Sequence, residues 1–167
     1  MERFEYDSVR LGAKLKTSEL VDRLSKICQQ LENYEQGGVL VDTLQDVARD
    51  LSLASMVGHS DRSVRVLVAC CLAEILRLFA PVAPFDARTS KRIFDLFVQQ
   101  LGNLGSASSA DPYTAKTVKL LGCLAEVEIF RIAVDNPDLD YIIERVFSTA
   151  LEVARYVLPS SRAFFPF

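Results

Sequence analysis

Residues 61–86, DRSVRVLVACCLAEILRLFAPVAPFD, decide the fold of this 167-residue chain. Asp61 offers a carboxylate that can cap the free N–H groups at the start of a helix. The residues that follow are apolar on nearly every side, so other elements are expected to cover this helix almost completely. Only four charged residues interrupt the pattern: Arg62, Arg65, Glu74 and Arg77. Two prolines then end the helix, because proline lacks a backbone donor and disfavours helix in the residue before it.

Apolar residues at three- and four-residue spacing predict further helices on both sides of this stretch. These predicted helices cover residues 18–33, 39–53, about 90–104, about 112–135 and about 139–157. Thr17 is expected to cap the first of them, and Thr89 or Ser90 the helix that follows the prolines. Sustained alternation of apolar and polar residues is absent from the sequence, so strands are not expected. The chain is therefore predicted to be all-α, with about six helices.

The helical pattern also sets the expected domain boundaries. Residues 1–16 are polar and aperiodic, which predicts a flexible N-terminal arm. The helical domain is expected to cover residues 17–158. Residues 159–167 are expected to form an apolar C-terminal tail.

A short repetition bears on the architecture. Residues 71–74, CLAE, recur at residues 123–126, and helical repeats of the HEAT or armadillo type have periods of about 40–47 residues. A chance match and a closed helical bundle remain alternatives. Asp61 and Arg65 favour a HEAT-like α-solenoid, since the second helix of a HEAT unit often opens with such a pair, bonded to neighbouring repeats. A structural role for Arg65 is thus expected, with ligand binding as the alternative.

Composition and motifs argue against several classes of function. The net charge of −3 argues against bulk binding to nucleic acid or acidic lipid. The sequence contains no secretory signal, no apolar run of about 18 residues, no glycine-rich phosphate loop and no G-x-S-x-G or H-E-x-x-H motif. Four cysteines without C-x-x-C spacing and a lone His59 indicate buried thiols rather than a metal site. We therefore expect no enzyme, no cofactor, no metal and no small-molecule substrate.

Residues 64–85, VRVLVACCLAEILRLFAPVAPF, resemble the N-terminal HEAT segment of the cohesin regulator family named for precocious dissociation of sisters. The resemblance implies a nuclear, non-enzymatic scaffold that acts in sister chromatid cohesion. It implies two partners, the kleisin subunit of cohesin and the wings-apart-like release factor, although kleisin binding in the family uses later repeats. A generic helical-repeat adaptor unrelated to cohesin is the alternative. Because family members have many more repeats, the chain is expected to be a truncated or divergent product, with its tail folded over the open apolar end.

The resemblance also implies a site. The family carries an Ala-Pro-acidic-Ala-Pro motif that is linked to engagement of regulatory partners. Mapped onto this chain, the candidate partner-binding residues are Ala80, Pro81, Val82, Ala83, Pro84 and Phe85. Val82 stands where the family has a carboxylate, which puts any contact that relies on that charge in doubt. The alternative is that the prolines only end the helix and set the turn to the next one.

Overall fold

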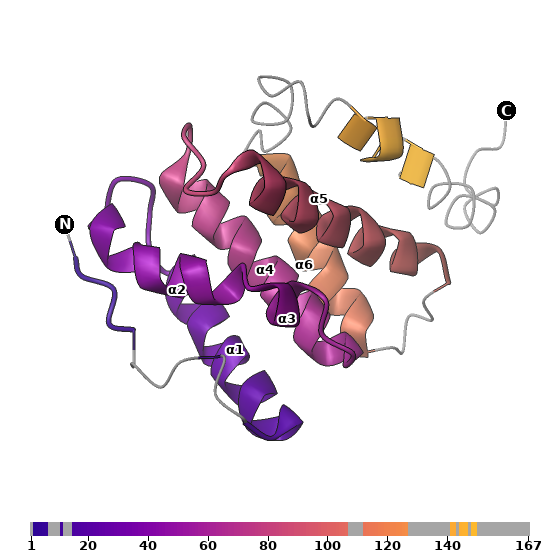
Figure 1. Ribbon diagram of the computed structural model, residues 1–167, viewed down its shortest axis with the longest axis horizontal. Helices are drawn as coiled ribbons and strands as arrows, with labels where there is room; N and C mark the ends of the chain where they lie inside the picture. Colours follow the sequence, from indigo (N-terminus) through magenta and orange to yellow (C-terminus); the bar gives the residue numbers. More distant parts are fainter. Residues whose placement is uncertain are drawn as a thin grey trace, which may run out of the picture.

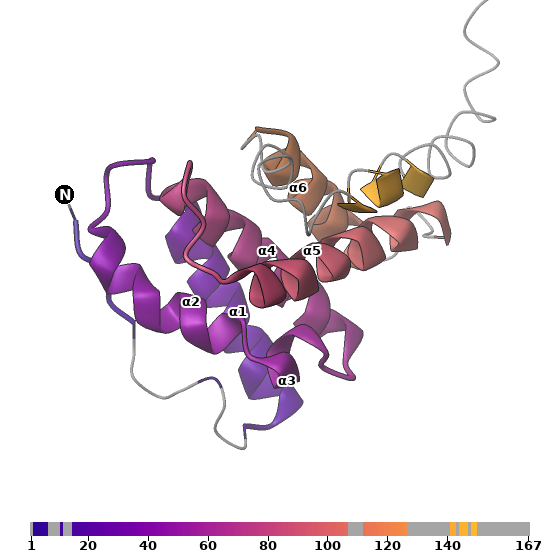
Figure 2. The same ribbon diagram turned by 45° about the horizontal axis from the view of Figure 1, so that its top comes forward.

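Helix α4 (Arg62–Phe79) forms the centre of the structure, a computed structural model in which α1, α2, α3, α5 and α6 all contact α4. The described residues are 2–6, 11, 15–106, 112–126, 141–142, 144–146 and 148–149. In two views, α4 lies between α1, α2 and α3 on one side and α5 and α6 on the other (Figures 1 and 2). The predicted all-α class is confirmed.

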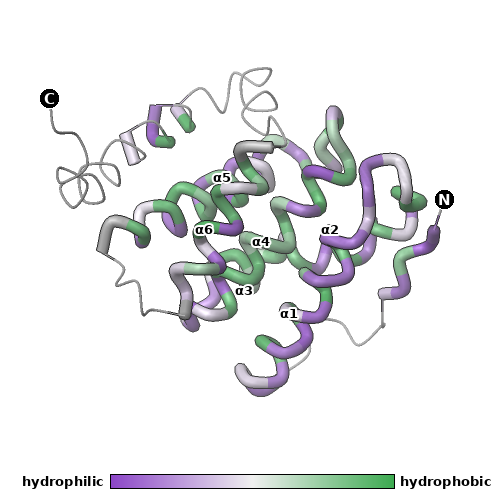
Figure 3. The backbone as a smooth tube through the Cα atoms, turned by 180° about the vertical axis from the view of Figure 1, so that it is seen from behind, coloured by the Kyte–Doolittle hydropathy of each residue, from purple (hydrophilic) through white to green (hydrophobic). Residues whose placement is uncertain are grey.

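The predicted start and burial of α4 are also confirmed. The Asp61 carboxylate accepts a hydrogen bond of 3.1 Å from the Val64 N–H, which is the expected cap. Most side chains of α4 are buried, and Val64, Val68, Cys71, Leu72 and Ile75 are all 0% exposed. Coloured by hydropathy, α4 is green over most of its length, whereas α1 and α2 carry much more purple (Figure 3).

Helix α1 (Thr17–Glu32) matches its predicted span, but its cap does not. The capping position is Lys16, which makes no side-chain capping bond, so the prediction of a Thr17 cap is wrong. Thr17 is already the first helical residue. Leu20, Leu24 and Leu31 lie on the face that packs against α4.

The single helix predicted over residues 39–53 is wrong, because the chain forms a 3₁₀ helix and a short α-helix there, followed by a third short piece just beyond residue 53. They are η1 (Val41–Leu44), α2 (Gln45–Leu51) and α3 (Ala54–Val57). At the start, the Thr43 hydroxyl donates to the Leu40 carbonyl, a local bond that competes with a regular helix. At the end, Leu53 is extended (φ −55°, ψ 140°), which turns the chain and buries Met56.

Helix α5 (Ala87–Gly102) begins earlier than predicted. The Asp86 carboxylate accepts a bond of 2.6 Å from the Thr89 N–H, so Asp86 is the cap and the prediction of Thr89 or Ser90 is wrong. Ser90 is buried inside the helix. The chain continues through η2 (Asn103–Ser106) to α6 (Pro112–Glu126), which packs on α4.

The described positions between 141 and 149 are helical and fall in the last predicted helix. The ends of that helix, the end of the helix predicted to reach residue 135, and the tail at 159–167 lie outside the described residues. Between η2, which ends at Ser106, and α6, residues 107–111 also lie outside the described residues.

Part of the segment predicted as a flexible arm packs against the helices. Phe4 is 5% exposed, and its N–H bonds the Thr43 hydroxyl at 3.0 Å. Glu2 forms a parallel bridge with Val39, the one β-type pairing of the described residues. These contacts involve residues distant in sequence, so local periodicity does not signal them.

Candidate functional site

A groove of about 710 Å³ separates α2 from the turn that follows α4. The turn and the start of α5 supply one wall: Phe79, Val82, Ala83, Pro84, Phe85, Asp86 and Thr89. The other wall consists of Val41, Gln45, Ala48, Arg49 and Ser52. Of the six residues predicted as partner contacts, residues 82–85 line this groove, whereas Ala80 and Pro81 lie beside it in the same turn.

The turn is held in place at both ends. The Val82 N–H bonds the Phe79 carbonyl at 3.2 Å, and the side-chain amide of Gln36 donates to the Ala80 carbonyl at 2.6 Å. The peptide bond between Ala80 and Pro81 is cis. At the far end, Asp86 caps α5. The path from α4 to α5 is therefore fixed by bonds to three different parts of the chain.

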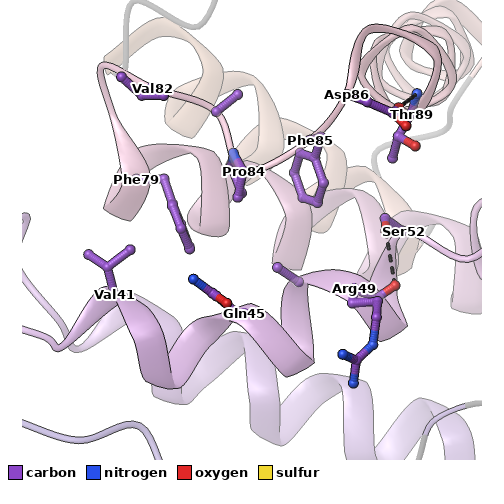
Figure 4. A pocket seen from close by; sticks show the side chains of 12 residues that line it. Val41, Gln45, Arg49, Ser52, Phe79, Val82, Pro84, Phe85, Asp86 and Thr89 are labelled. Carbon is purple, nitrogen blue, oxygen red and sulfur yellow. Dashed lines mark hydrogen bonds between the residues drawn. The ribbon is translucent and has the colours of Figure 1, made fainter.

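The wall formed by the turn is largely apolar. The Phe79 and Phe85 rings extend toward α2, with Pro84 between them (Figure 4). Phe79, Ala83 and Phe85 are partly buried and pack against the core. Val82 is 73% exposed at the outer rim, which makes it the most exposed large apolar residue among the described positions.

The facing wall is more polar and carries a cation. Arg49 forms ion pairs with Asp46 at 2.6 Å and Asp50 at 3.8 Å, and its side chain is 64% exposed. Across the groove, the Thr89 backbone N–H holds the pKa of the Asp86 carboxyl below its ordinary value. Asp86 therefore stays ionised at neutral pH, and the groove offers apolar contact flanked by one cation and one anion.

The residues of the α2 wall were missed by the sequence reasoning. Residues 41, 45, 48, 49 and 52 follow one stripe at helical spacing, so a signal for a shared face was present. Polar residues on such a stripe are the usual solvated face of a helix. Only the tertiary position of the turn distinguishes this stripe from any other polar one.

Arg65 has the structural role expected of it, but its hydrogen-bond partners differ from the expected ones. Its guanidinium donates to the carbonyl oxygens of His59 at 2.6 Å and Ser60 at 2.8 Å. These carbonyls belong to the turn that precedes its own helix rather than to a neighbouring repeat. Arg65 thus fixes the entry of α4 together with Asp61.

The sequence also predicts no metal site and no membrane-spanning segment, and these two expectations can be examined only in the described residues. There, no group of three or more His, Cys, Asp or Glu side chains is arranged to hold a metal ion. In that same part of the chain, no helix combines the length and apolar character needed to cross a membrane. The groove thus remains the candidate site.

Comparison with known proteins identifies a family. The family model described as "Sister chromatid cohesion protein PDS5 protein" matches residues 18–161. The chain is 30% identical over 141 residues to sister chromatid cohesion protein pds5 of Schizosaccharomyces pombe, covering 84% of this chain and 12% of that protein. It is also 30% identical over 145 residues to the PDS5 homolog B of Homo sapiens, covering 86% of this chain and 10% of that protein. The chain thus spans only about a tenth of the length of these curated relatives.

A solved structure supports the fold. The chain is similar to one described as "Structure of the Pds5-Scc1 complex and implications for cohesin function", with a TM-score of 0.81 and 26% identity. The similarity covers 89% of this chain and 23% of the solved one. The HEAT-like α-solenoid is therefore confirmed over the closed helical bundle.

Proposed function

Because the chain belongs to the PDS5 family of sister chromatid cohesion proteins, we propose that it acts in sister chromatid cohesion as a non-catalytic helical scaffold. In this proposal the chain works in the nucleus and binds cohesin subunits or a release factor. The name of the family and the Pds5–Scc1 description of the similar structure support this role over that of a generic adaptor.

The groove between α2 and residues 82–85 is the proposed partner site. The observation that carries the proposal is the coincidence of two independent results. The resemblance points to residues 80–85, and the structure places four of these residues along a groove that is open to solvent. A turn that only ended α4 would not require an exposed apolar rim at Val82.

The chemistry of the walls defines the occupant. Phe79, Pro84 and Phe85 offer an apolar surface that suits an apolar side chain of a short peptide. Arg49 offers an exposed guanidinium that suits a carboxylate on the same peptide. Val82 replaces the family's acidic residue, so at that rim the partner meets an apolar group instead of a charge.

Two partner classes are included in the proposal. The first is a segment of the kleisin subunit, consistent with the Pds5–Scc1 complex that the similar structure contains. The second is a segment of the wings-apart-like release factor, which the resemblance implies. We assign the groove to the release factor, because the family's kleisin contacts involve later repeats.

The test is a fluorescence anisotropy titration of the full chain with labelled release-factor and kleisin peptides. Arg49→Gln removes the groove cation, and Val82→Arg places a long charged side chain on the rim. Each is expected to weaken binding of the release-factor peptide by about tenfold, the equivalent of about 1.4 kcal/mol. Thermal unfolding should change little, since both side chains are exposed.

Matched controls separate a groove effect from a general one. Lys26→Gln removes an exposed cation from α1, and Val118→Arg alters a valine of α6 that is 55% exposed. Both should bind as the wild type does. Absence of binding by the wild-type chain, or equal weakening by the controls, contradicts the groove assignment.

A further inference from the structure

The four cysteines meet at the junction of α1, α4 and α6. Cys28 lies on α1, Cys70 and Cys71 on α4, and Cys123 on α6. All four are thiols rather than disulfides, and the first three are buried. The sequence predicted buried thiols but did not show that helices far apart in the chain bring them to one place.

Cys28 sits beside the two thiols of α4. The Cys71 thiol is 0% exposed and donates to the Leu24 carbonyl of α1 at 3.5 Å. The Cys70 thiol donates to the Lys116 carbonyl of α6 at 3.6 Å and is 6% exposed. Cys70 is therefore the α4 thiol nearer to solvent, on the side where α1 and α6 approach each other.

Cys28 has a proton acceptor that reaches the surface. Its thiol donates to Glu32 Oε1 at 3.1 Å, and Glu32 Oε2 pairs with Lys119 Nζ at 2.5 Å. The Glu32 side chain is 23% exposed and that of Lys119 is 53% exposed, so the proton can leave to water. This arrangement of thiol, carboxylate and ammonium spans α1 and α6.

The pKa values of the Cys28 thiol and the Glu32 carboxyl are shifted in opposite directions. When Cys28 is ionised, the Cys70 and Cys71 thiols can turn from the Lys116 and Leu24 carbonyls to donate to its sulfur, which holds the pKa of Cys28 below its ordinary value. Burial raises the pKa of the Glu32 carboxyl. Both effects favour a thiolate at Cys28 with its proton on Glu32. A thiolate is the reactive form of cysteine toward oxidants.

We propose that Cys28 and Cys70 form an oxidation site, at which a peroxide converts the pair into a disulfide linking α1 to α4. The Cys28 thiolate attacks a peroxide oxygen, the O–O bond breaks, and Cys28 becomes a sulfenic acid while hydroxide leaves and is protonated to water. The Cys70 sulfur then attacks the Cys28 sulfur, and the S–O bond breaks. The departing hydroxide takes the Cys70 proton and forms a second water.

The disulfide has a structural consequence for the groove. The loop that it closes, residues 28–70, contains η1, α2 and α3, and α2 is one wall of the groove. Cross-linking two distant points of the chain restricts the unfolded state and stabilises the folded one. The oxidised chain is therefore expected to hold α1, α2 and α4 together at higher temperature than the reduced chain.

The experiment treats the full chain with hydrogen peroxide, alkylates the remaining thiols and maps the linked peptides by mass spectrometry. The expected product is a Cys28–Cys70 linkage within one chain, with a raised Tm that dithiothreitol reverses. A Cys28–Cys71 linkage, a linkage through Cys123, linkage between chains or only sulfinic products would each overturn the assignment.

Variants test the roles of the individual groups. Cys28→Ser and Cys70→Ser should abolish the linkage, whereas the matched control Cys123→Ser should retain it. Glu32→Gln should slow formation of the linkage by about tenfold or more without changing its position, because the proton acceptor is lost. An unchanged rate in Glu32→Gln would overturn the role of the carboxylate. The wild-type peptide map decides the linkage itself even if a buried variant folds poorly.

Discussion

The side-chain amide of Gln36 lies 2.6 Å from the carbonyl oxygen of Ala80, so the loop after α1 holds the turn that ends α4. Gln36→Ala should therefore loosen the turn at little cost in global stability, since an exposed hydrogen bond contributes about 1 kcal/mol or less. We expect faster amide hydrogen exchange at Val82 and Ala83. The exposed Gln29 of α1 offers a control, and Gln29→Ala should leave exchange in the turn unchanged. Equal exchange in both variants would count against the role of Gln36.

The Asp61 cap should be visible in the stability of the whole chain. Asp61→Ala leaves the Val64 N–H without its partner and should lower the free energy of unfolding by about 1 kcal/mol. Asp61→Asn keeps an acceptor oxygen and should recover most of the loss. Urea denaturation of the three proteins provides the measurement, and a loss of the same size in both variants would contradict the capping role.

Glu74, which is buried, and Arg77, which is partly buried, form a polar cluster on α4 beside the end of α1. Arg77 Nε lies 2.7 Å from Glu74 Oε2, and its Nη2 bonds the carbonyls of Leu31 and Tyr34 at 3.1 and 2.9 Å. Arg77→Met should cost about 3 kcal/mol, because it leaves a buried carboxylate without a partner. Combining it with Glu74→Leu should recover part of that loss. Chemical denaturation that shows no recovery would indicate that the carbonyl bonds, not the ion pair, dominate.

Tyr6 links the N-terminal segment to α2, and its effect should depend on pH. Burial, followed by the charge of Asp50 3.1 Å away, raises the pKa of the Tyr6 hydroxyl above its ordinary value. Above pH 10, about the pKa of an unfolded tyrosine, the unfolded chain loses this proton while the folded chain keeps it, so the free energy of unfolding should fall as pH rises. Tyr6→Phe should reduce that fall, as measured by urea midpoints from about pH 9 to pH 11. If the free energy of unfolding fell with pH equally in Tyr6→Phe and in the wild type, the role assigned to the Tyr6 hydroxyl would be contradicted.

The central helix was predictable because its evidence is local. Asp61 stands directly before a run of apolar residues, two prolines follow, and the helix needs neighbours on every side whatever the topology. The cap at Asp86 was less accessible, since Thr89 and Ser90 are equally good capping residues by type. The bond from the Thr89 N–H to Asp86 and the burial of Ser90 inside α5 decide between them, and both are seen only in the folded structure.

Only one wall of the candidate groove was predictable, because only that wall is marked by a local sequence motif. Residues 82–85 were identified through a motif, which is a property of contiguous sequence. Gln45 and Arg49 belong to a helix stripe that looks like ordinary solvated surface until the turn is placed above it. The break at Leu53 and the docking of Phe4 also depend on partners some 40 residues away or on packing against α4.

The central position of α4 also bears on how the chain can change over evolutionary time. The buried positions of α4 together contact five neighbouring helices, so most substitutions there must fit a packed interface, whereas a substitution at Val82 meets mostly water. We expect lineages to keep the helix nearly fixed while the adjoining turn drifts. Partner preference can then diverge between descendants of one ancestor without any of them losing the architecture that marks their kinship.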